Sequence, residues 1–283
     1  MNALKELVAS LIVSTLTSFD SMVADARNIL TGSGTVFNAD SIWNSMMTIS
    51  NALKPFCYIL IGICLLISFA QEAARVDTLK WETAIKLGVK MALARVCIDV
   101  APTFMRACYV QAATWISSIG GRNVTLGNLV AQRVSTLMRD INNWQAIGLL
   151  ATIGIVAIAI KICGIMVQAI AFGRMFELYI YVAVSPLPCA FFPLGEGGGF
   201  SRTTQNFFKA FAAVCLQGVM MIICFELFGL IVSGSIATLA GSVSGAGSVQ
   251  ISELCYTMLL GAIVLVMSVG KCGSWAKSIL NAM

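Results

Sequence analysis

Long apolar runs without a charge set the strongest limit on what this chain can fold into. Residues 55–71, 178–195 and 254–270 contain no charged side chain, and residues 144–172 and 209–234 each carry a single charge in their interior. A helix needs about 20 mostly apolar residues to cross the roughly 30 Å of hydrocarbon in a bilayer. The five stretches therefore predict five transmembrane helices.

The composition also indicates that the protein is surrounded by a lipid bilayer. Of the 283 residues, 58% are hydrophobic and 11% are charged, whereas a soluble domain carries about 25% charged residues. A chain with so few polar groups cannot cover a soluble core, so a bilayer is expected around it. We predict an all-α fold, a polytopic helical membrane protein with about five transmembrane helices and with amphipathic helices at the N-terminus and in the middle.

Residues 83–119 are apolar enough to cross a membrane but carry five charges and an internal proline, Pro102. At 100° per residue the charges fall on two opposite faces of a helix. They are Lys86, Lys90, Arg95, Asp99 and Arg106. We expect this segment to dock against the protein and the membrane surface. A sixth transmembrane helix, with both chain ends inside, is the alternative.

The distribution of basic residues predicts the orientation, because Lys and Arg collect on the cytoplasmic side of a membrane. Residues 73–143 hold nine of the 18 Lys and Arg, and residues 235–253 hold none. The N-terminus is therefore expected outside and the C-terminus inside. The expected organisation has extracytoplasmic amphipathic helices over 1–54, a first span over 55–71, a basic cytoplasmic or interfacial helical segment over 72–143, and a four-span membrane domain over 144–283.

Two charges lie inside predicted spans, Lys161 and Glu226. A charge near the bilayer centre costs on the order of 3 kcal/mol, so such residues usually face a partner or water. One hypothesis is that the two side chains pair or line a common polar cavity. The alternative is that each residue lies near a membrane–water interface and that its side chain extends to the lipid headgroups. A midplane pair would also suit a small-solute secondary transporter, which is the alternative function.

No enzyme signature is found, and we expect neither a cofactor nor a metal. Histidine is absent, which excludes triads and zinc sites that need it. The ten cysteines have no CxxC spacing. They are expected to pack as small apolar residues rather than to form disulfides or bind metal.

A resemblance is carried by residues 172–188, FGRMFELYIYVAVSPLP, and by the segment after them, with a Gly199–Phe200 turn, FFKAF over 207–211 and LQG over 216–218. This pattern resembles the TrbL family, polytopic conjugal-transfer proteins equivalent to the VirB-six subunit of type IV secretion systems, in the form found in Gram-positive bacteria. The resemblance implies a membrane subunit, with no catalytic residues, of a machine that moves a protein–DNA substrate across the cytoplasmic membrane. It also implies homo-oligomerisation, contact with other envelope subunits and a transport ATPase, and transient contact with transferring DNA.

Within the resembling segment, Pro186 and Pro188 prevent a regular helix end and free backbone carbonyls, which must find partners in a neighbouring helix or in water. Together with Glu177, they mark a broken helix that we expect to line a pore or to contact another subunit.

Overall fold

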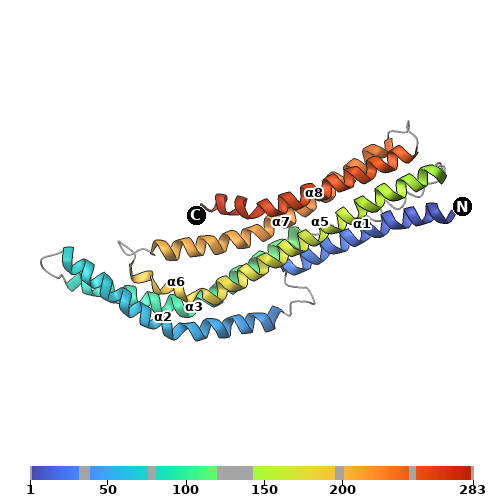
Figure 1. The fold of residues 1–283 in the computed structure, drawn as a ribbon. Helices are drawn as coiled ribbons and strands as arrows, with labels where there is room; N and C mark the ends of the chain where they lie inside the picture. Colours follow the sequence, from blue (N-terminus) through green and yellow to red (C-terminus); the bar gives the residue numbers. More distant parts are fainter. Residues whose placement is uncertain are drawn as a thin grey trace. The chain divides into compact units, whose positions relative to one another are not determined.

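The computed structural model describes residues 2–31, 39–75, 81–119, 143–194, 201–241 and 247–281, and within these ranges it contains helices and turns but no strand. The long helices are α1 (Asn2–Thr31), α2 (Ala39–Arg75), α3 (Trp81–Ile119), α5 (Asn143–Val184), α7 (Arg202–Gly241) and α8 (Gly247–Ile279) (Figure 1). Two short helices, α6 (Pro186–Ala190) and the 3₁₀ helix η2 (Phe192–Leu194), follow α5. The predicted all-α class is confirmed. The glycine turn near residues 195–200 lies outside the described residues, as do residues 120–142 of the basic segment.

Five helices in the described ranges are long and apolar enough to cross a membrane, as the sequence predicts. They are Glu6–Thr31 in α1, Ser41–Gln71 in α2, Ile147–Ala190 in α5 and α6, Arg202–Ser235 in α7, and Ile251–Ile279 in α8. The set differs from the expected one in two respects. The N-terminal helix α1 is now a candidate span, and residues 144–195 supply one candidate instead of two.

Two separate spans over 144–172 and 178–195 require a turn between them, but α5 continues without one from Asn143 to Val184. Gly173 is the only weak helix former at that point, and one glycine costs a helix only about 1 kcal/mol. The charges at Arg174 and Glu177 form an ion pair one turn apart, which stabilises a helix rather than ending it. A break does occur later, at Ser185.

Helix α2 likewise has no end at residue 54, where the sequence places the start of the first span. It runs through Pro55, which lies inside the helix. Proline removes one backbone hydrogen bond but does not always end a helix that tertiary packing holds in place.

The chain forms two compact units, which we describe one at a time. Unit 1 consists of residues 1–34, 115–173 and 218–272, and unit 2 of residues 35–114, 174–217 and 273–283.

Unit 1 is built around α1, whose buried face carries Val8, Ile12 and Phe19. The start of α1 shares a small apolar cavity with Ile153 of α5 and Leu254 of α8, so these three helices begin at the same end of the unit. The contacts of α1 then advance along α5 in the same direction, from Met22 at Gly164 to Asp25 at Gln168. Helix α7 runs the opposite way, since Cys224 meets Cys272 and Phe228 meets Gly261.

Unit 2 is built on an antiparallel pair formed by α2 and α3. Lys54 and Tyr58 of α2 both reach Asp99 of α3, while the earlier Trp43 contacts the later Tyr109. Figure 1 shows the two helices side by side, running in opposite directions. Buried side chains fill the seam between this pair and the α6–η2 segment: Cys57, Ile61, Ala94, Ile98, Ala101, Cys189, Ala190 and Phe192.

Close packing in unit 1 gives a first prediction. A methyl group at Gly261 would lie 3.1 Å from the Phe228 ring and 3.4 Å from Val232, so Gly261→Ala forces the aromatic ring to move, at about 1 kcal/mol or more. Gly270→Ala, on the same helix with nothing within 4 Å, should be neutral or stabilising by up to about 1 kcal/mol. The measurement is the melting temperature in detergent, and equal values for the two variants would contradict the packing.

Candidate functional site

The structure places a charged pair between apolar helices of unit 1. The Arg27 guanidinium on α1 donates to the Glu226 carboxylate on α7 at 2.5 Å, and the two side chains are only 17% and 16% exposed. Close to this pair, the ring of Phe19 on α1 packs edge to face against the ring of Phe228 on α7, with the ring centroids 5.7 Å apart. In a buried pair each charge compensates the other, and removing one partner leaves the second charge buried without a counter-charge. The pair therefore fixes how α1 lies against α7.

The hypothesis of a Lys161–Glu226 pair meets a different arrangement. Glu226 is held by Arg27, a residue that the sequence analysis did not weigh. Lys161 is exposed on α5, and among the residues that the structure describes it has no carboxylate partner. Within the described residues, the carboxylate of Glu226 is therefore paired with Arg27 rather than with Lys161.

A second contact between α1 and α5 is polar but lies at the surface of unit 1. The Gln168 amide on α5 donates to the Asp25 carboxylate on α1 at 3.4 Å. Lys161 lies seven residues before Gln168, which is two helical turns, and therefore on the same side of α5. Lys161 and Gln168 thus lie on the same side of α5, the side that contacts α1 at Asp25.

The expected broken helix is present in unit 2. Helix α5 ends at Val184, the chain bends at Ser185, and α6 begins with Pro186 at its first position. The Ser185 hydroxyl donates back to the Val182 carbonyl at 2.8 Å. Two proline rings so close together deny the helix its regular hydrogen bonds, which is the physical cause of the break.

Hydroxyl groups of neighbouring helices donate to backbone carbonyls of the segment that follows the break. Thr204 on α7 donates to the Pro188 carbonyl at 2.7 Å, and Ser68 on α2 donates to the Pro193 carbonyl at 3.0 Å. Pro186 and Pro188 are buried. The segment is therefore anchored inside unit 2, which is what an apolar solvent requires of irregular backbone.

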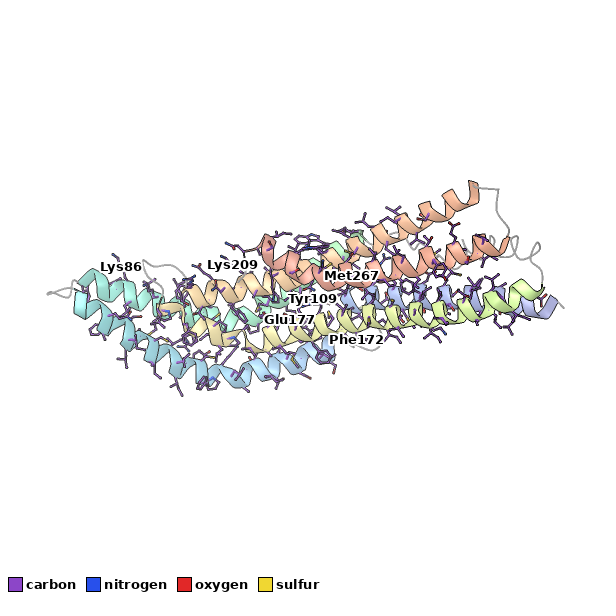
Figure 2. The ribbon with its side chains drawn as sticks, turned by 45° about the horizontal axis from the view of Figure 1, so that its top comes forward. Lys86, Tyr109, Phe172, Glu177, Lys209 and Met267 are labelled. Atoms are coloured by element: carbon purple, nitrogen blue, oxygen red, sulfur yellow. The ribbon has the colours of Figure 1, made fainter. Side chains whose placement is uncertain are left out.

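Glu177 lies on α5 before the break and pairs with Arg174 at 2.5 Å, with both side chains about one-third exposed or less. Figure 2 labels Glu177 on α5 and Tyr109 on α3. The Tyr109 hydroxyl donates to the Met175 sulfur at 3.8 Å, and burial raises the pKa of this phenol above its ordinary value, so it stays protonated. The ring of Trp43 packs against Tyr109 and Tyr179 at 5.3 and 5.0 Å.

A third group of charges joins α2 to α3. Asp99 accepts a hydrogen bond from Tyr58 at 2.7 Å and lies 3.5 Å from the Lys54 ammonium. The Arg95 guanidinium lies 5.7 Å over the Tyr58 ring. Several of the charges of residues 83–119 are thus used to bind α2, a role that their spacing on one helix does not show. Lys86 lies near the start of α3 and is exposed (Figure 2).

The cysteines are free thiols, and five of the ten are buried. Cys97 and Cys189 lie 3.1 Å apart in the core of unit 2. Within the described ranges, no three Cys, Asp or Glu side chains converge in a way that can hold a metal ion. Ion pairs and hydrogen bonds in each unit join helices to one another.

Together, these features define a class: a multi-pass helical membrane protein in which ion pairs join neighbouring helices. The sequence matches the family described as "TrbL/VirB6 plasmid conjugal transfer like protein" over residues 20–186, more than half of the chain. The chain belongs to this family, and it is therefore a structural component of a conjugal-transfer apparatus, a type IV secretion system, that associates with other components of that system. No curated protein and no solved structure matches it.

The Arg27–Glu226 pair generates a second prediction. Arg27→Met leaves the Glu226 carboxylate without its charge partner in an apolar setting and should destabilise the protein by about 3 kcal/mol. Lys161→Met, which removes an equally charged side chain that has no carboxylate partner among the described residues, should leave the melting temperature in detergent nearly unchanged. The reversed pair, Arg27→Glu with Glu226→Arg, should recover much of the loss. Equal behaviour of the two methionine variants would refute the role of the pair.

Proposed function

We propose that this protein is an integral channel or scaffold subunit of a type IV secretion apparatus in the cytoplasmic membrane, and that it helps to move a protein–DNA substrate across that membrane. The observation that carries this proposal is the family match over residues 20–186. The helices that can cross a bilayer support it, because a subunit of such a path must be embedded in the membrane.

The exposed surface of the protein supports assembly in a membrane. Exposed isoleucine, leucine, valine and phenylalanine side chains lie along α2, α5, α7 and α8. Surfaces this apolar are covered by lipid or by other proteins. We propose that the subunit forms homo-oligomers and contacts other envelope subunits, a cytoplasmic transport ATPase and, transiently, the transferring DNA.

The transporter alternative has no observation in its favour. It depends on Lys161 and Glu226 forming a midplane site, and Glu226 is instead paired with Arg27. A buried ion pair within one subunit holds helices together and offers no open position to a solute.

Deletion of the gene from a donor cell that carries the conjugative element provides the third prediction. Transfer to a recipient should fall below detection, and plasmid-borne wild-type protein should restore it, because the path lacks a membrane subunit. Complementation with Glu253→Gln, a change at an exposed carboxylate of α8, is the matched control and should also restore transfer. Undiminished transfer without the gene would refute the proposed function. Crosslinking to DNA in transit then distinguishes a subunit that lines the path from one that only supports it.

The direction of the helices in unit 1 yields the fourth prediction. Helices α1 and α8 begin at the same end of the unit, and Lys271 and Lys277 lie toward the far end of α8, whereas residues 235–253 before and at its start hold no Lys or Arg. Since Lys and Arg favour the cytoplasm, an N-terminal tag should be accessible from outside and a C-terminal tag from inside. Protease protection of tags in spheroplasts and in inverted vesicles measures this. Both tags on one side would contradict the orientation.

A further inference from the structure

The exposed side of α1 is polar along almost its whole length. Its exposed polar residues follow a spacing of three and four, which places them on one face of the helix. We call this the polar face of α1, and it consists of Ser10, Ser14, Thr17, Ser21, Asp25 and Asn28. Eighteen residues of helix cover about 27 Å, close to the hydrocarbon thickness of a bilayer. Among the described side chains of α1, Leu7 is the one large apolar residue that is exposed.

The other long helices of unit 1 present the opposite chemistry. On α5, Ile158 and Ile162 are 63% and 49% exposed, on α7 Ile231 is 66% exposed, and on α8 Leu260 is 66% exposed. These helices are suited to face lipid. Helix α1 instead turns its apolar residues into the protein, where Val8, Ile12, Leu16 and Phe19 are buried.

The contacts of α1 place its polar face at the depth of the membrane. From Ile12 to Asp25, α1 lies along residues 153–168 of α5, which fall within the apolar run over 144–172 that the sequence predicts to cross the membrane and within a candidate span of the structure. A helix that packs beside a membrane span over this length lies at the same depth. It therefore cannot lie flat on the membrane surface, as a sequence with this amphipathic pattern first suggests.

The hydroxyl groups of the polar face can tolerate an apolar neighbour, but the charges beside them cannot. Ser14 and Thr17 donate to the carbonyls of Leu11 and Val13 in their own helix, which lowers the penalty of leaving water. Asp25 is exposed at one end of the face, and exposed Lys161 follows the same border on α5. Opposite charges that are exposed within a membrane are found where protein lines a water-filled cavity.

We propose that the polar face of α1, with Lys161 beside it, lines a water-filled part of the translocation path in the assembled apparatus. The inference rests on the proposed function and deepens it, because it names the surface of the subunit that faces the water in the translocation path. Water solvates both charges and all six polar residues, whereas lipid would leave the Asp25 and Lys161 charges without solvent. The apolar faces of α5, α7 and α8 are left for lipid and for contacts with neighbouring subunits.

Cysteine accessibility in the full-length protein tests the inference. Ser14, Thr17 and Ser21 are changed one at a time to cysteine in a chain whose ten native cysteines are replaced, and the apparatus is labelled in cells with a small charged methanethiosulfonate. We expect labelling at least about tenfold faster than at Ile158→Cys and Ile162→Cys, because a thiol in hydrocarbon stays protonated and the thiolate is the reactive form. The isoleucine positions are matched controls, since both are exposed on a neighbouring helix at similar depth.

Each outcome decides for or against the inference. Slow labelling at all five positions would show that lipid or another protein covers the polar face, and labelling at Leu16→Cys as fast as at Thr17→Cys would show that no particular face is wetted. A second measurement does not depend on labelling: Ser14→Leu with Ser21→Leu should keep the normal amount of protein in the membrane but lower transfer at least about tenfold, since apolar side chains dewet a narrow path. Unchanged transfer by this variant would overturn the inference, whereas the proposed function itself fails only if transfer survives loss of the gene.

Discussion

The burial of the apolar side of α1 is the interaction on which unit 1 depends. Phe19 and its neighbours fill the space between α5, α7 and α8, and the Arg27–Glu226 pair fixes the position of α1 against α7. In lipid there is little hydrophobic force to drive helices together, so close packing and polar contacts must supply the stability. Glycine at 164 and 261 allows the close approach, and the ion pair gives the arrangement its specificity.

Only 11% of the residues are charged, and several of these charged groups form ion pairs or hydrogen bonds within or between helices. Arg174 is paired with Glu177 within α5, and Asp99 of α3 is shared by Lys54 and Tyr58 of α2. Backbone carbonyl groups also need hydrogen-bond donors where a helix is interrupted. Where the prolines break the helix after Val184, the Ser185 hydroxyl donates to the Val182 carbonyl, and hydroxyl groups of Thr204 and Ser68 donate to the carbonyls of Pro188 and Pro193 in the segment that follows. An unsatisfied carbonyl in an apolar setting costs several kcal/mol, so the break can exist only where such donors are in reach.

Much of the fold was predictable because apolar length is a local property of a sequence. The runs at 55–71, 209–234 and 254–270 lie in helices that are long and apolar enough to cross a membrane, and the proline-broken segment at 186–188 occurs where expected. The division of residues 144–195 into two spans near Arg174 is wrong. Arg174 and Glu177 form an ion pair one turn apart, and this pair allows the helix to continue through both charges. Glu226 was recognised as a residue that needs a partner, but Arg27 is 199 positions away along the chain.

The sequence by itself determined that this is a helical membrane protein with about five candidate spans, because a bilayer imposes a length and a polarity on every segment that crosses it. Its family also followed from local motifs. Only the tertiary structure decided which charges meet and which side of each helix is covered, because these depend on contacts between residues far apart in the chain. The amphipathic pattern of α1 shows this most clearly: the sequence gives it one apolar and one polar side, but only its packing shows that the apolar side is turned inward.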